Sequence, residues 1–279
     1  MVELAPDCTI QTRSNDNWET YMNVLFYRFK EAIKTSRISP LLRFLKGLTR
    51  KATTNDLYDF QTQQILKTVL TEESSCIDIG ANRGDILKLM VKYAPNGSHL
   101  AFEPLPHYCK LLKRIFPKVS VYNMALSDVE GTSDFKYVVN APGYSGLRKR
   151  VYHIRKAIIE NIRVQVKRLD DVVPDSISPN FIKIDTEGSE YNILRGALKL
   201  ILRAKPILLF EAGKESTGQY GVKPEDFYTL ICSDMSYMIS TMNRYLSKSR
   251  PLTLAEFVDN WHSGTEYYFL AYPIKKTTD

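Results

Sequence analysis

The chain has 279 residues, of which 44% are hydrophobic and 25% are charged, and its formal net charge is +7. These proportions are close to globular averages and exclude disordered and fibrous classes. No apolar stretch approaches the roughly 18 residues that span a bilayer, and the first residues lack the basic flank and apolar run of a signal peptide. Four scattered cysteines without C-x-x-C spacing exclude a disulfide scaffold. We therefore expect a cytoplasmic protein with reduced thiols.

Residues 1–52 are predicted to form a helical N-terminal extension. Helical periodicity is clearest over 18–33, and the region carries no strand pattern. Residues 37–51 are amphipathic enough for peripheral contact with a membrane surface, and they fit equally well a helix packed on the core. The sequence leaves both alternatives and the role of the extension open, and it does not indicate an oligomeric state.

Residues 53–279 are predicted to form one α/β domain. Brief apolar runs over 75–79, 99–103, 119–124, 181–185 and 207–211 are typical of strands buried on both faces of a parallel sheet. Helical periodicity over 85–93, 108–116 and 189–204 separates them, which indicates a doubly wound, Rossmann-like sheet. The last third predicts a helix over 224–232, a strand over 237–241, a helix that opens with the capping box T-L-A-E at 253–256, and a strand over 267–272.

The positive charge is concentrated in two windows. Residues 32–55 hold six basic side chains and no acid, and residues 148–168 hold eight basic side chains against Glu160 alone. Such runs are usually solvated faces, but the second window falls where a substrate loop is expected and there also favours an anionic partner. The segment 144–146 (Y-S-G) within the preceding loop is expected to be a flexible cover for a pocket.

Chemically suggestive residues stand where the predicted strands end, which is where ligands bind in an open α/β sheet. The first strand runs into a glycine turn with Asp78, Gly80, Asn82 and Gly84, and the helix after it presents free N–H groups. The second strand ends in Glu103, an acid placed to accept hydrogen bonds from ribose hydroxyls. Further polar residues follow the third, fourth and fifth strands: Ser127, Asp128, Asp185, Glu187 and Glu211.

A ribose-binding acid without the glycines of a pyrophosphate site favours S-adenosylmethionine as the cofactor. We expect Asp78 and the turn amides to hold its amino-acid end, Glu103 its ribose, and Ser127 its adenine edge. Asp185 and Glu187 are then expected beside the sulfonium and the methyl acceptor.

The combined pattern resembles the FkbM family of class I methyltransferases, from about residue 56 to residue 273. The motifs that carry the resemblance are I-D-I-G-A-N-R-G (77–84), F-E-P (102–104), A-L-S-D (125–128), L-D-D (169–171), I-K-I-D-T-E-G (182–188) and F-E (210–211). The resemblance implies a mostly parallel seven-stranded sheet with an antiparallel C-terminal strand. It also implies an S-adenosylmethionine-dependent O-methyltransferase that acts on hydroxyls of sugars, glycolipids or polyketide-like products. The implied cofactor-binding residues are Asp78, Gly80, Ala81, Asn82, Gly84, Glu103, Ser127, Asp128 and Asp185.

A general base is needed to take the hydroxyl proton of the acceptor, and acids at strand ends are the candidates. Asp185 and Glu211 come first and Glu187 next, while His153 in the basic window is a weaker candidate. Relatives often have a histidine after the fifth-strand acid, whereas this chain has Ala212. The same departure removes the Asn of catechol-type sites, so we expect no metal.

Two rival functions remain open at this point. The pair Lys183 and Asp185 fits ribose methylation of RNA, but the second Lys and the Glu of that tetrad have no counterpart, and the motifs of base methylation are missing. Nucleic acid is therefore a disfavoured partner, and a small molecule or glycan with a free hydroxyl is favoured. This acceptor is expected to be anionic if the basic windows contribute to binding it. The other rival is an inactive methyltransferase fold kept as a binding module.

Overall fold

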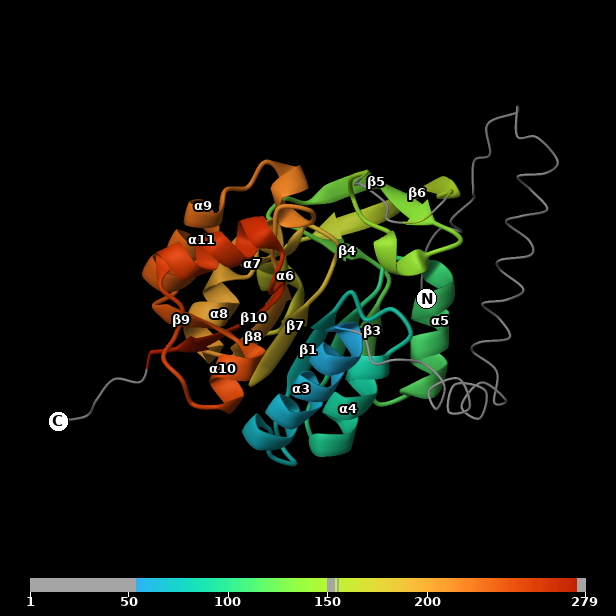
Figure 1. Ribbon diagram of the computed structural model, residues 1–279. Coiled ribbons are helices and arrows are strands. Elements are labelled where there is room, and N and C mark those ends of the chain that lie inside the picture. The colour runs from blue at the N-terminus through green and yellow to red at the C-terminus, as the bar shows by residue number, and fades with distance from the viewer. Residues whose placement is uncertain (1–53, 150–153, 155, 275–279) are drawn as a thin grey trace, which may run out of the picture.

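The computed structural model describes residues 54–149, 154 and 156–274 of the chain. The expectations for residues 1–52, and those for His153, lie outside the described residues. The described part forms a seven-stranded sheet with helices on both faces and a second, smaller sheet beside it (Figure 1). Among the described helices, none combines the length and the apolar composition that crossing a membrane requires.

The large sheet has the topology that the sequence predicts. Its strands lie in the order β3 (Ser120–Tyr122), β2 (Leu100–Phe102), β1 (Cys76–Ile79), β7 (Phe181–Ile184), β8 (Ile207–Glu211), β10 (Tyr268–Pro273) and β9 (Tyr237–Thr241). The first five strands in this order are parallel to one another, and β10 is antiparallel to both of its neighbours. The prediction of a mostly parallel sheet with an antiparallel C-terminal strand is confirmed.

Alternate side chains of the central strands enter two separate hydrophobic cores. Ile77 and Ile79 of β1 belong to one core and Cys76 to the other, as the two-residue period of a strand requires. The first core is closed by α7 (Glu190–Arg195), α8 (Leu198–Ala204), α9 (Pro224–Thr229) and α11 (Leu254–Ser263), and the second by α3 (Thr54–Val69), α4 (Asp85–Tyr93) and α10 (Met242–Leu246) (Figure 1). Burial on both faces explains why these strands read as continuous apolar runs.

The smaller sheet was not predicted. It contains β4 (Ala125–Leu126), β6 (Ile159–Lys167) and β5 (Gly131–Val138), and it packs on α5 (Pro106–Ile115) through Tyr108, Phe135 and Val164. Nine residues of the second basic window therefore belong to a strand rather than to a substrate loop. In this window Arg163, Lys167 and Arg168 form ion pairs with Asp134, Glu130 and Asp171.

Two predicted helices are shorter than the periodicity indicates. The stretch 189–204 divides into α7 and α8 near Gly196. Glycine is required at this position because a Cβ would lie 2.2 Å from the carbonyl oxygen of Ser127. Asp170 of α6 (Leu169–Val172) then accepts hydrogen bonds from the amides of Lys199 and Leu200 and caps α8. The helix over 224–232 ends as α9 at Thr229 and continues in a π-helical turn, η3 (Leu230–Asp234).

Two further expectations are met. The capping box at the start of α11 is present, with Thr253 and Glu256 each bonded to the other's backbone N–H. The three cysteines within the described residues are free thiols.

Candidate active site

The turn after β1 is compact and lies against two other strand ends. The amides of Gly80 and Ala81 both donate to the carbonyl oxygen of Phe102 at the end of β2. Gly80 has a φ of 74°, and a Cβ at this position would lie 1.9 Å from the carbonyl oxygen of Asp185. Only glycine fits here, because the positive φ and the contact with the β7 end both exclude a side chain. Asn82 is also left-handed, with a φ of 49°, a conformation that asparagine tolerates.

Glu103 lies directly after β2 and anchors this turn. Its Oε2 accepts from the Asn82 amide at 2.7 Å and its Oε1 from the Leu105 amide at 2.8 Å. The side chain is almost fully buried, and burial raises the pKa of Glu103 to about 7, against the opposing effect of the two amide hydrogen bonds. Each carboxylate oxygen keeps a second acceptor position, so Glu103 can still accept from the two hydroxyls of a ribose.

The sequence suggests a role for Lys183 only in the alternative of RNA ribose methylation. In the structure its side chain instead contacts two carboxylates and the glycine turn. The parallel register sets it beside Asp78, and its Nζ lies 3.3 Å from Asp78 Oδ1 and 3.4 Å from Asp185 Oδ2. Nζ also donates to the carbonyl oxygen of Gly80 at 3.0 Å. Burial favours the neutral amine, but the two carboxylates raise the pKa of Lys183 above its ordinary value. Lys183 thus joins the glycine turn to the end of β7.

Asp78 is completely buried beneath the turn. Burial raises its pKa, and the neighbouring Lys183 opposes that shift. Asp78 does not line the cleft described below, and its charged partner is Lys183. Its contact with the cofactor stays a prediction.

Three candidate catalytic carboxylates meet at the ends of β7 and β8. One oxygen from each of Asp185, Glu187 and Glu211 lies within 4.8 Å of the others, and all three side chains are partly buried. The structure therefore brings together the three acids that the sequence proposed as bases. Oxygen ligands of this type also suit hard divalent cations, so the expectation of a metal-free site stays a prediction.

Tyr268 is a site residue that the sequence reasoning missed. It faces Glu211 in the antiparallel register of β10 and β8, and its hydroxyl donates to Asp185 Oδ2 at 2.8 Å. Tyr58 of α3 packs edge-on against the Tyr268 ring, with 5.2 Å between the ring centroids. With 17 tyrosines in the chain, only this register singles Tyr268 out.

An open cleft of about 390 Å³ lies over these strand ends. Its floor includes Gly80, Asn82 and Glu103 and one wall includes Asp185 and Glu187, while the opposite wall comes from the loop after β5, which contains the 3-10 turn η1 (Pro142–Tyr144). Gly80, Asn82 and Glu103 line this cleft, and a glycine turn beside a buried acid has the chemistry that fits the nucleoside indicated by the sequence.

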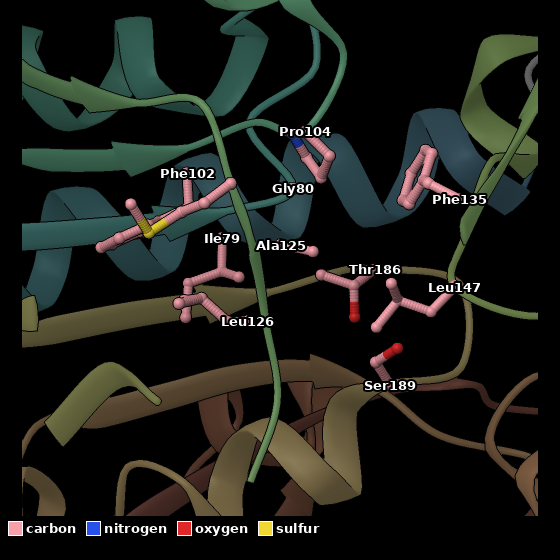
Figure 2. A pocket seen from close by; sticks show the side chains of 11 residues that line it. Ile79, Gly80, Phe102, Pro104, Ala125, Leu126, Phe135, Leu147, Thr186 and Ser189 are labelled. Atoms are coloured by element: carbon pink, nitrogen blue, oxygen red, sulfur yellow. The ribbon is translucent and has the colours of Figure 1, made fainter. Parts of the chain in front are cut away.

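A second, more apolar pocket adjoins the cleft. Figure 2 shows Phe135 and Leu147 at one end of it and Phe102 and Leu126 at the other. Thr186 lies next to Leu147, and Ser189 lies below both. Ser127 and Asp128 line neither pocket. Ser127 donates to Asp128 Oδ1 at 3.1 Å, and Asp128 Oδ2 pairs with Arg195 at 3.1 Å. Ala81 and Gly84 shape the turn without lining the cleft, and the cofactor contacts assigned to all four residues stay predictions.

Comparison with known proteins identifies the family. The family model of the methyltransferase FkbM domain matches residues 78–248, more than half of the chain. The protein belongs to the FkbM methyltransferase family, and its cofactor is S-adenosylmethionine.

Two curated relatives are similar to this chain over part of their length. Methyltransferase sdnD of Sordaria araneosa is 30% identical, with 43% of this chain and 59% of the relative covered. Methyltransferase 1 of Beauveria bassiana (strain ARSEF 2860) is 29% identical, with 45% and 59% covered. The chain thus spans about three fifths of the length of these relatives.

Among solved structures, the methyltransferase FkbM from Methylobacillus flagellatus KT has a TM-score of 0.45 and 18% identity, covering 74% of this chain and 48% of its own. The plantazolicin methyltransferase BpumL, solved with SAH, has a TM-score of 0.41 and 8% identity, covering 91% of this chain and 96% of its own.

Proposed function

We propose that the protein is an O-methyltransferase that transfers the methyl group of S-adenosylmethionine to a hydroxyl of a small molecule or glycan, such as a sugar, a glycolipid or a polyketide-like product. The observation that carries the proposal is the meeting of Asp185, Glu187 and Glu211 beside the cleft. A hydroxyl, unlike an amine with a free lone pair, needs help to lose its proton, and a positioned carboxylate provides it.

The residues divide the work as follows. When bound, S-adenosylmethionine would supply an electrophilic methyl group, with a neutral thioether as the leaving group that keeps the electron pair of the carbon–sulfur bond. Gly80, Asn82 and Glu103 hold the nucleoside and fix its orientation, because an in-line displacement depends on alignment of the reacting atoms. Glu211 or Glu187 accepts the proton of the acceptor hydroxyl. Asp185 already accepts a hydrogen bond from Tyr268 and lies 3.4 Å from Lys183. We therefore propose that Asp185 orients the acceptor rather than taking its proton.

The charge of the acceptor is a second part of the proposal. Arg148 lies at the surface with its guanidinium 4.8 Å from the centre of the Tyr220 ring, and Lys149 beside it is exposed. These two cations can attract an anionic acceptor such as a phosphorylated sugar, whereas Arg163, Lys167 and Arg168 are held in ion pairs. The free thiols favour a reducing compartment, so we also propose that the protein is cytoplasmic.

The two rivals fare differently. Ribose methylation of RNA needs a lysine that reaches the substrate, but Lys183 is only 6% exposed and is held by Asp78, Asp185 and Gly80. An inactive binding module remains an outcome of the experiment, because a binding role uses the same cleft.

The experiment is methyl transfer from isotope-labelled S-adenosylmethionine to fractions of small molecules, glycans and RNA. We expect label in a small-molecule or glycan product that resists mild alkali, as an ether does and an ester does not, and loss of labelling in the Glu187→Gln and Glu211→Gln double variant. The exposed Glu225→Gln variant is the matched control. Label in a nuclease-sensitive fraction, or cofactor binding without any transfer, would overturn the proposal. Equal labelling before and after phosphatase treatment would count against the anionic acceptor.

A further inference from the structure

The turn that carries two of the site carboxylates has an uncommon backbone. After β7 the chain runs through Asp185, Thr186, Glu187 and Gly188 before α7 begins. Glu187 has a φ of 64°, in the left-handed region that non-glycine residues seldom occupy, and Gly188 has a φ of 119°. A backbone of this kind persists only where the surroundings determine it, so the contacts that hold the turn bear on how the site is built.

Glu190, the first residue of α7, holds this turn from beneath. Its Oε1 accepts from the Thr186 amide at 2.7 Å, from the Thr186 hydroxyl at 3.1 Å and from the Gly188 amide at 3.2 Å. The side chain is completely buried, and its Oε2 finds no hydrogen-bond partner among the described residues. One carboxylate oxygen therefore accepts hydrogen bonds from both of the amides that flank Glu187.

Neighbouring segments enclose the turn on two sides. A Cβ on Gly188 would lie 2.4 Å from the Tyr220 ring, and a Cβ on Gly146 would lie 3.5 Å from the carbonyl oxygen of Glu187. These contacts limit where the turn can move, but they do not satisfy its amides. Among the described residues, Glu190 Oε1 is the acceptor to which the Thr186 and Gly188 amides donate.

We propose that Glu190 is a positioning residue, which fixes the turn 185–188 so that the Asp185 and Glu187 carboxylates face the cleft and meet Glu211. Nothing in the chain's motifs assigns Glu190 a role, and it does not line either pocket. It acts through the backbone and touches neither cofactor nor acceptor. This role rests on the same site as the proposed function, but it requires only that the site binds the cofactor and not that it methylates a hydroxyl.

The side-chain chemistry gives a matched set of variants. Glu190→Gln keeps an oxygen acceptor for the three donors, and its amide nitrogen takes the place of Oε2. Glu190→Ala removes the acceptor and leaves two buried N–H groups unpaired, and Glu190→Leu does the same while filling most of the volume. Ile231→Ala, a fully buried core substitution within η3, is the control for a general loss of stability.

Two measurements without any methyl acceptor test the proposal: hydrogen exchange of the peptide that contains residues 185–190, and calorimetric binding of S-adenosylhomocysteine. In Glu190→Ala and Glu190→Leu we expect local protection to be lost and affinity to fall about tenfold, because the amides that shape the cleft wall lose their partner. We expect Glu190→Gln to stay within about threefold of wild type. Ile231→Ala should keep both readouts at the turn while its melting temperature falls.

Unchanged exchange and affinity in Glu190→Leu would overturn the inference. So would a Glu190→Gln variant as impaired as Glu190→Leu, because charge rather than acceptance would then matter. Failure of both Glu190→Ala and Glu190→Leu to fold, with a native Glu190→Gln, would also overturn it in favour of a global structural role. None of these results depends on whether a hydroxyl is methylated, so the failure of the proposed function is separately visible.

Discussion

Cofactor affinity should depend on pH through Glu103. Burial raises the pKa of this carboxyl from an ordinary 4.5 to about 7, so in the free protein it ionises close to neutral pH. The raised value means that folding favours the protonated form. The stability it contributes is fully present below pH 4.5 and is lost as pH rises through 7, and the difference of 2.5 pH units amounts to roughly 3 kcal/mol.

A ribose reverses this preference, because its two hydroxyls donate to the carboxylate and favour the ionised form. If S-adenosylhomocysteine binds only that form, about a tenth of the protein is competent at pH 6 and about nine tenths at pH 8. The dissociation constant should then be roughly tenfold higher at pH 6 than at pH 8.

The assay is calorimetry with S-adenosylhomocysteine across this range, repeated in Glu103→Gln. The glutamine variant should bind more weakly and show little of the pH dependence, which separates Glu103 from the equally buried Asp78. Proton release on binding at pH 7, seen as a dependence on the ionisation enthalpy of the buffer, is a second readout. Equal affinity of the wild type at pH 6 and pH 8, or an unchanged pH dependence in the variant, would refute the reasoning.

Two further substitutions test the framework under the cleft. Lys183→Met leaves Asp78 buried without its cation and should lower the free energy of unfolding by about 3–5 kcal/mol in urea denaturation, whereas an unchanged midpoint would show that the ion pair is dispensable. Gly80→Ala should cost far more than Gly221→Ala: both positions have positive φ, worth about 1–2 kcal/mol, but only at Gly80 does the new Cβ collide with backbone. Equal melting temperatures for the two alanine variants would contradict the assigned contact with the Asp185 carbonyl.

The large sheet could be predicted from the sequence because its central parallel strands β1, β2 and β7 are buried on both faces, which leaves recognisable apolar runs. The smaller sheet was missed for the opposite reason. In β6, the exposed residues Arg163 and Gln165 alternate with buried Val164 and Val166, and the basic side chains in and around the strand make it resemble a charged loop. The ion pairs that neutralise those charges come from residues up to 37 positions away and leave no local signal.

The site was predictable where chemistry follows a strand end, as at Glu103, Asp185 and Glu211. Tyr268 and Glu190 were not, because their roles depend on tertiary placement. Tyr268 reaches Asp185 only through the antiparallel register of β10, and Glu190 reads locally as an ordinary acid in the first turn of a helix. The sequence associates Lys183 only with the disfavoured alternative of RNA ribose methylation, whereas the parallel register buries it beside Asp78.

The place of β10 in the sheet has a practical consequence for dividing the chain. This strand lies inside the sheet, between β8 and β9, yet it begins 20 residues after the family match ends at residue 248. A fragment trimmed to the match would lose an interior strand, expose two new edges and remove the tyrosine that orients Asp185. Expression of the catalytic unit should therefore extend through residue 273, because the final strand completes both the sheet and the site.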